Sequence, residues 1–185
     1  MYLDGERAGR AVSPAVGVVL LVAITVLIAG ITMVLASEYG SYLNEPAPMV
    51  GESSGELVHN IDTEGGEDDQ IVRLRHISGD PIDVSEIEIQ VDATDACGKT
   101  ARIVDLPTNT LGSDNYEGDD IFDYNSPEGG ELDEDVTDGT WSPGETARFR
   151  ITSGECEINS GDEVDVRVVH KPTSSVIIDE TLKAS

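Results

Sequence analysis

The feature that most constrains this chain is a stretch without any charged residue, which runs from Val12 to Ser37. A helix that crosses a membrane needs about 20 apolar residues, whereas the apolar part of a cleaved signal peptide has about 7 to 15. The stretch is too long for an ordinary signal peptide. Ser13 suits the N-cap of a helix and Pro14 suits its first turn. The sequence therefore predicts one long transmembrane or assembly helix over residues 12–37.

The charges on either side of this stretch predict its orientation. Arg7 and Arg10 precede it, and the next basic residue after it is Arg73. Because a positively charged flank stays in the cytoplasm, the N-terminus is predicted to lie inside and everything after Ser37 outside. The precursor is thus expected at the cell membrane as a single-pass protein with an exported C-terminal domain.

Residues 10–25 read Arg-Ala-Val-Ser-Pro-Ala-Val-Gly-Val-Val-Leu-Leu-Val-Ala-Ile-Thr. This segment resembles the N-terminus of haloarchaeal type IV pilins, in which a short charged leader precedes a Val-Ser-Pro start and a long apolar helix. The resemblance implies cleavage by a prepilin peptidase after the Arg10-Ala11 pair, between Ala11 and Val12, with residues 1–11 as the leader. The glutamate that many bacterial pilins carry near the start of the mature helix is replaced here by Val16.

Other cleavage positions remain open at this point. The alternatives for the prepilin peptidase are cleavage after the pair Arg7-Ala8 or after the pair Ala8-Gly9. A signal peptidase could instead cut before Ser37, because residues 34–36 place small side chains where that enzyme reads them. The length of the apolar stretch argues against this last site.

Acidic residues greatly outnumber basic ones in this chain. The sequence has 37 acidic and 11 basic residues, a formal net charge of -26. Such a surface repels itself in dilute salt, but the screening length falls to about 3 Å at 1 M ionic strength. The alternative is disorder, of which high charge and few aromatic residues are typical. We expect a folded domain adapted to high salt, and no nucleic-acid partner, because phosphate binding requires basic patches.

Short runs with apolar residues at every second position favour β-strands and oppose disorder. The clearest runs are 72–76, 87–91, 147–151 and 164–169, and weaker ones are 56–60, 100–106 and 175–182. About seven short strands separated by turn residues predict an antiparallel sandwich. The chain is therefore divided into the helix, a linker or helix extension over 38–55, and an acidic all-β domain over 56–185.

Residues 108–142 are predicted to form a long acidic loop with one short strand near 121–124. The segment is rich in Asp, Glu, Gly, Asn and Ser. A loop of this length in a compact domain tends to be functional or disordered. We expect any adhesive contact to lie here.

Cys97 and Cys156 are the only cysteines. An even pair in an exported domain favours a disulfide over two free buried thiols, because the outside is oxidising. The bond would close a loop of about 60 residues, at the base of the acidic loop, and stabilise the domain by roughly 4 kcal/mol.

No residue pattern predicts a metal, a cofactor or catalysis. His76 and His170 fall on the apolar side of their strands and are expected in the core, and His59 stands alone. The acidic clusters 67–69 and 119–120 do not fit a calcium-binding loop and are interpreted as solvated surface. We find no nucleophile elbow, phosphate loop or dinucleotide motif, so the protein is not expected to be an enzyme.

Two further segments, 74–82 and 168–177, resemble a His-x-x-Gly-Asp turn and the closing hairpin of the pilin exported domain. The resemblance as a whole implies the structural subunit of a surface filament that serves adhesion. Its partners would be copies of itself or other pilins through the helix, the prepilin peptidase and the membrane. The alternative is a non-filamentous binding module anchored outside the cell by the same helix.

Overall fold

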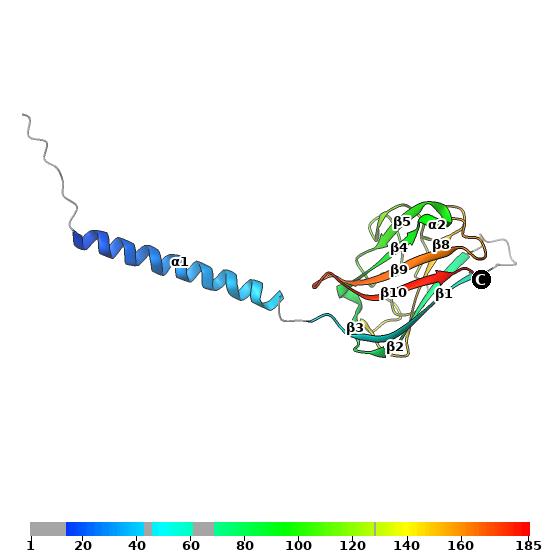
Figure 1. Cartoon of the computed structure of the whole chain (residues 1–185), viewed down its shortest axis with the longest axis horizontal. Helices are drawn as coiled ribbons and strands as arrows, with labels where there is room; N and C mark the ends of the chain where they lie inside the picture. Colours follow the sequence, from blue (N-terminus) through cyan, green and yellow to red (C-terminus); the bar gives the residue numbers. More distant parts are fainter. Residues whose placement is uncertain (1–13, 43–45, 61–68, 128) are drawn as a thin grey trace, which may run out of the picture. The chain divides into compact units, whose positions relative to one another are not determined.

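The computed structural model describes residues 14–42, 46–60, 69–127 and 129–185. The chain divides into two compact units, Met1–Glu45 and Pro46–Ser185. The first contains helix α1, Pro14–Tyr42 (Figure 1). Its alanines and leucines favour this helix, and proline at its first position loses no hydrogen bond. The helix continues to Tyr42, within the segment 38–55 that is predicted as a linker or helix extension, and the first strand of the second unit begins at Val50.

The second unit contains ten strands and two short helical turns. The strands are β1 Val50–Asn60, β2 Asp69–Gly79, β3 Ile82–Asp83, β4 Ile87–Ala93, β5 Lys99–Ile103, β6 Tyr116–Gly118, β7 Thr140–Trp141, β8 Thr146–Thr152, β9 Glu163–His170 and β10 Ser175–Lys183. The turns are η1 Val84–Glu86 and α2 Thr94–Cys97. Each of the seven predicted runs coincides with a strand, which confirms the all-β prediction. The predicted number was too low, because β3, β6 and β7 are too short to show an alternating pattern.

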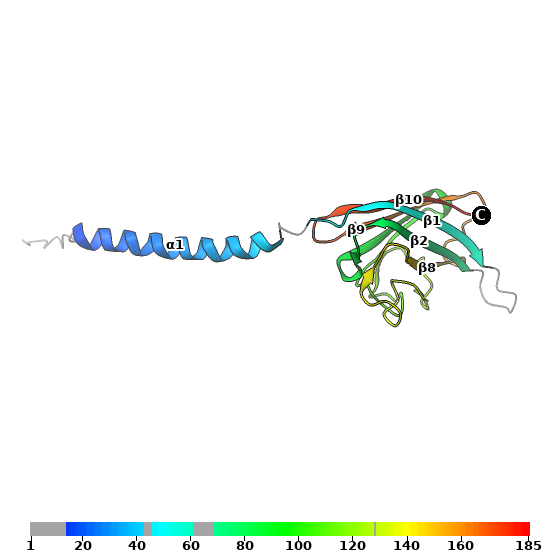
Figure 2. The ribbon, with the colours of Figure 1, turned by 90° about the horizontal axis from the view of Figure 1, so that it is seen from below.

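The strands form three antiparallel sheets, with the orders β1–β2–β8, β10–β9–β4–β5–β6 and β3–β7. The edge strands β1 and β10 lie side by side (Figures 1 and 2), joined by a bridge between Leu57 and Ala184. The chain after β6 in turn bridges β8 through Phe122 and Ile151. The two larger sheets thus meet along both sides and enclose one core.

The core is formed by the apolar residues at every second strand position, which all point to the same side of their sheet. Along β4, Ile87, Ile89 and Val91 are at most 1% exposed, while the residues between them are half-buried. Burying such a side chain fully stabilises the fold by about 1.5–3 kcal/mol. Aromatic rings fill the space near the edge, where Phe122 meets Phe149 edge to face with centroids 5.8 Å apart.

The segment over residues 108–142 differs from the long loop that the sequence predicts. It contains β6 and β7, and five of its apolar side chains are buried, namely Leu111, Ile121, Phe122, Leu132 and Trp141, whereas Val136 is exposed. The expected strand near 121–124 is only the isolated bridge at Phe122. Because each buried side chain anchors the segment separately, it packs against the core although no regular pattern is visible in its sequence.

Candidate functional site

Helix α1 is apolar around its whole circumference. Its segment Ala15–Met33 has 19 residues, which makes it long and apolar enough to cross a membrane. At about 1.5 Å per residue this segment is roughly 28 Å long, close to the thickness of a hydrocarbon core. Its aliphatic side chains are exposed, Val16 by 49% and Leu21 by 65%. A helix that is hydrophobic on all sides requires an apolar environment, either lipid or other helices.

The few polar or small residues of α1 are compatible with such an environment. The Thr25 hydroxyl donates to the Val22 carbonyl at 2.9 Å, and the Thr32 hydroxyl donates to Ile28 at 3.0 Å. Both hydroxyls are therefore satisfied inside the helix and cost little in an apolar medium. A side chain placed at Gly17 or Gly30 would meet nothing within 4 Å in this chain. The helix does not need these glycines for its own packing, and they leave room for another helix.

The cleavage residues predicted from the sequence, Arg10, Ala11 and Val12, lie outside the described residues, as does the N-cap residue Ser13. The rival position before Ser37 lies inside α1. The structure therefore supplies no geometry for the leader.

Comparison with known proteins bears on the same segment. Residues 10–50 match the family model described as archaeal type IV pilin, N-terminal. The N-terminal segment of this chain is therefore similar to that of archaeal type IV pilins. The match covers α1 and the first residue of β1, and most of the β-domain lies beyond it. No curated protein matches the chain.

The His-x-x-Gly-Asp turn that resembles the pilin family holds the incoming chain at the start of the domain. Asp80 accepts a hydrogen bond from the Met49 backbone at 3.1 Å, and the Asp80 backbone donates to the Met49 carbonyl at 3.0 Å. Gly79 has a φ of +132°, and a Cβ there would lie 2.3 Å from the Met49 carbonyl oxygen. Only glycine fits this crossing. The sequence predicted the turn but not its contact with Met49.

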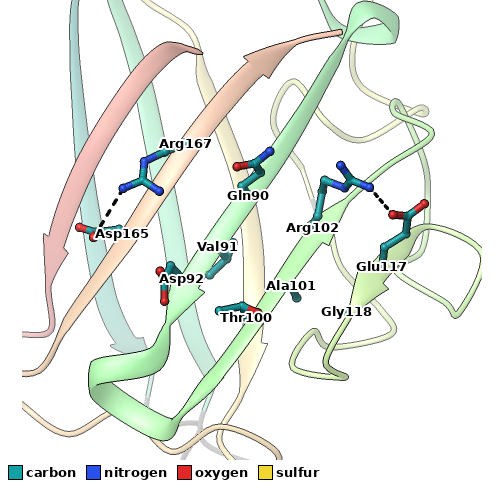
Figure 3. Close-up of a pocket in the computed structure, with 10 residues that line it drawn as sticks. All are labelled: Gln90, Val91, Asp92, Thr100, Ala101, Arg102, Glu117, Gly118, Asp165 and Arg167. Carbon is teal, nitrogen blue, oxygen red and sulfur yellow. Dashed lines mark hydrogen bonds and ion pairs between the residues drawn. The ribbon is translucent and has the colours of Figure 1, made fainter. Parts of the chain in front are cut away.

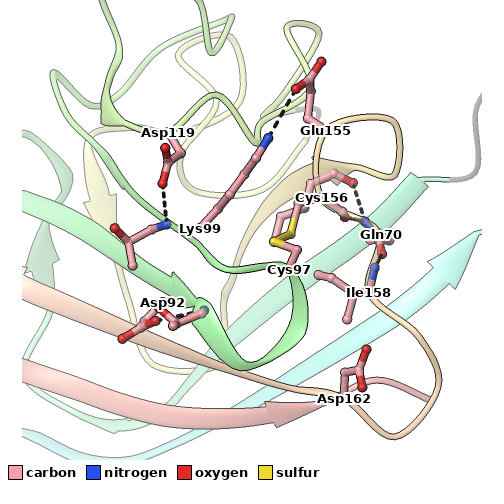
Figure 4. Close-up of a disulfide and its surroundings, with 12 residues drawn as sticks. Gln70, Asp92, Cys97, Lys99, Asp119, Glu155, Cys156, Ile158 and Asp162 are labelled. Atoms are coloured by element: carbon pink, nitrogen blue, oxygen red, sulfur yellow. Dashed lines mark hydrogen bonds and ion pairs between the residues drawn. A yellow bond between two sulfur atoms is a disulfide. The ribbon is translucent and has the colours of Figure 1, made fainter.

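Cys97, at the end of α2, and Cys156 form a disulfide with Cα atoms 5.4 Å apart (Figure 4). The segment around Cys156 is also held by Gln70, which is 1% exposed. The Gln70 amide donates to the Cys156 carbonyl at 2.7 Å and accepts from the Ile158 backbone at 2.6 Å. Beside the bond, Lys99 lies 3.3 Å from a Glu155 oxygen. This irregular segment is thus fixed both covalently and by a buried side chain.

His76 and His170 are buried, as their strand positions predict. His76 lies 3.3 Å from the Trp141 carbonyl and packs edge to face against the Trp141 ring. His170 contacts the Thr173 hydroxyl at 2.8 Å and a Glu86 oxygen at 3.2 Å. These contacts satisfy both rings within the fold, which is the usual arrangement of a core histidine.

Among the residues that the structure describes, no group of three or more His, Cys, Asp or Glu side chains could hold a metal ion. Residues 67 and 68 of one acidic cluster lie outside the description. In the other cluster, Asp119 accepts a hydrogen bond from the Thr100 backbone at 2.8 Å. The Asp120 carboxylate lies by Tyr116, and burial together with this contact raises the pKa of the Tyr116 hydroxyl. Both carboxylates thus make local contacts directly after β6, Asp119 with β5 and Asp120 with β6.

A row of polar side chains crosses the outer face of the five-stranded sheet. Successive cross-strand partners are Asp179, Arg167, Gln90, Arg102 and Glu117. Ion pairs join both ends of the row, with Arg167 3.1 Å from Asp179 and Arg102 paired to Glu117. The Glu117 carboxylate raises the pKa of Arg102. An open hollow of about 360 Å³ lies over this face (Figure 3).

The neighbouring row of cross-strand partners contains acidic residues and no basic residue. Asp92 and Asp165 are direct cross-strand partners, and Thr181 and Thr100 lie beyond them. Like charges in directly opposed positions destabilise a sheet. Hydrogen bonds from the Thr94 hydroxyl and backbone hold the pKa of Asp92 below its usual range, so Asp92 stays ionised.

The three-stranded sheet carries a basic cluster that no local pattern in the sequence predicts. Arg73, Arg75 and Arg148 lie side by side on the outer face of the three-stranded sheet, because Arg73 and Arg148 are cross-strand partners and Arg75 shares the face of Arg73. They line a hollow of about 550 Å³. Only the strand register brings residues of β2 and β8 together. The expectation that the chain has no basic patch is therefore wrong for this face.

Proposed function

We propose that this chain is the structural subunit of an archaeal type IV pilus-like surface filament. One observation carries the proposal. A helix that is apolar on every side, and long enough to cross a bilayer, lies within the segment that matches the archaeal pilin N-terminus. Such a helix can reside in lipid before assembly and among copies of itself afterwards.

The proposed maturation begins at the cytoplasmic face. Arg7 and Arg10 keep the N-terminus inside while the acidic domain is exported. Cleavage after Ala11 by a prepilin peptidase removes the charged leader and leaves Val12 as the first residue. Loss of the leader removes two arginines, which otherwise hold the end of the helix at the membrane surface. The shortened helix can then leave the bilayer.

In the proposed filament, the helix exchanges lipid contacts for contacts with other helices. Because lipid tails are as apolar as leucine, close packing and not the hydrophobic effect favours this exchange. Gly17, Ala29 and Gly30 would allow neighbouring backbones to approach closely. The β-domain would surround this core and face the medium, where its acidic side chains keep the surface hydrated.

We further propose that the domain works in concentrated salt and that its exposed surface serves adhesion. Of the 37 acidic residues, 33 lie in residues 46–185, together with nine of the eleven basic ones. In molar salt the screening length is about 3 Å, so this charge no longer opposes close contact between subunits. Adhesion rests on the pilin resemblance and on no particular residue.

The N-terminal sequence of the mature protein from its native host tests the proposal first. A start at Val12, with surface filaments that disappear when the gene is deleted, is the expected result. A start at Ser37 would show an ordinary secreted domain. An intact leader without filaments would favour the membrane-anchored binding module instead.

A further inference from the structure

The basic hollow on the three-stranded sheet is unusual in a domain with so much negative charge. Two rows of cross-strand partners form its floor, Glu56–Arg73–Arg148 and Ser54–Arg75–Thr146. Five of these six positions carry either an arginine or a neutral side chain, so one face holds a local excess of positive charge. Arg73 and Arg148 oppose each other directly, which by itself destabilises the sheet.

The charges of this hollow are only partly balanced inside the chain. Glu56 lies 2.9 Å from Arg73. Within 46–60, 69–127 and 129–185, no ion pair reaches Arg75 or Arg148, and both side chains are exposed. By contrast, Arg102, Arg150 and Arg167 each have a carboxylate partner. The guanidinium groups of Arg75 and Arg148, which pair with no carboxylate of the described residues, can therefore donate hydrogen bonds to carboxylates of another molecule.

The other large sheet carries the complementary surface. A hollow of about 290 Å³ on its outer face is lined by Asp92, Asp95, Glu163 and Asp165, together with two threonines. Asp92 and Asp165 face each other across the strands. Arg167 of the same chain lies 3.9 Å from Asp165 and balances part of this charge. Arginines from outside would relieve the remaining repulsion within this hollow, as carboxylates would relieve it between Arg73 and Arg148.

We propose that the basic hollow of one copy binds the acidic hollow, formed by Asp92, Asp95, Glu163 and Asp165, of a neighbouring copy. Because the two hollows lie on different sheets, one copy can offer its arginines while its own carboxylates receive those of the next. In such a head-to-tail contact, each copy is rotated relative to the one before it. When these rotations do not close a ring, copies can be added without limit, and the contact extends a filament. In concentrated salt only groups in direct contact attract, and the planar guanidinium pairs with carboxylate through two hydrogen bonds.

This inference rests on the proposed function, and the test uses the full chain in its native host. Replacement of both arginines, Arg75→Glu with Arg148→Glu, should lower the yield of filaments sheared from cells by about tenfold, as expected for two lost contacts. The fold should persist, because a glutamate at 148 would face Arg73. Formation of the disulfide and the amount of subunit in the membrane report folding separately.

Matched variants isolate the contact from net charge. The single change Arg148→Glu is compared with Lys171→Glu, another exposed residue with the same change of charge. The inference requires that only the change at residue 148 lowers the filament yield. Adding Asp95→Arg and Glu163→Arg to the double arginine variant should restore filaments in part, since the two introduced arginines can then pair with the two introduced glutamates.

The possible outcomes separate the two proposals. Wild-type filaments with an unchanged yield in the double arginine variant would overturn this inference and leave the pilin function in place. An equal loss in the Lys171 variant, or no restoration by the charge exchange, would also overturn it. Absence of filaments from wild-type cells, with an unprocessed N-terminus, would refute both.

Discussion

Replacement of both cysteines by alanine should greatly weaken the domain without changing its fold. Cys97 and Cys156 are separated by 59 residues. In the chain-entropy model, the closed loop restricts the unfolded chain, and its loss lowers the free energy of unfolding by roughly 4 kcal/mol. A domain of this size is typically stable by about 5–15 kcal/mol, so this is a large share of the total. Gln70 still fixes the chain at Cys156 and Ile158, so the folded state should remain native.

The assay is urea unfolding of the full chain in detergent and molar salt, followed by the fluorescence of Trp141. This residue is the only tryptophan and is fully buried, so the signal reports the β-domain and not α1. With a urea slope of about 2 kcal/mol per molar, the midpoint should fall by roughly 2 M. Wild-type protein treated with a reductant is the matched control and should unfold at the midpoint of the alanine variant.

Two results would refute the reasoning. The first is an unchanged unfolding midpoint of the wild type on reduction. The second is two titratable thiols in the native protein from its host. Either would mean that the cysteines do not constrain the unfolded chain.

Three more predictions use the same assay. Gln70→Leu should cost about 1–3 kcal/mol, because buried backbone groups at Cys156 and Ile158 lose their partner; an unchanged midpoint would contradict this. Burial and the Glu145 charge raise the pKa of Glu131. Its contribution to the free energy of unfolding is therefore complete below its usual pKa of 4.5 and is lost as pH rises through the raised value. Glu131→Gln should therefore weaken the decline in stability above pH 4.5, and parallel pH curves would disprove it. Transfer from molar to millimolar salt should lower the unfolding midpoint, because 33 carboxylates in residues 46–185 then repel one another; a midpoint independent of salt would exclude that cause.

The alternating runs predicted the main strands because each of these strands buries one face. Along β8, Ala147, Phe149 and Ile151 are buried and the intervening arginines are not, which a period of two records directly. The segment over 108–142 could not be predicted in this way. Leu111, Leu132 and the other anchors are spaced irregularly, so only the finished core shows that each one is buried.

The candidate site was predictable only in part, for a similar reason. Length and composition identify α1, since a stretch without charge needs no tertiary contact to be recognised. The basic hollow depends on the register of β2 against β8, which places Arg148 opposite Arg73. Residues so distant in sequence give no local signal of their proximity. The contact of Asp80 with Met49 is equally non-local.

The uniform apolar surface of α1 has a consequence for any assembly built from it. A helix with one apolar stripe turns that stripe toward its neighbours and so fixes its rotation about its own axis. Exposed aliphatic side chains surround α1 on every side, so burial of apolar surface alone does not fix this rotation. The helical twist and rise of a filament of such subunits would then be set by contacts between domains, and substitutions on the β-domain surface could change filament symmetry while the helix sequence stays the same.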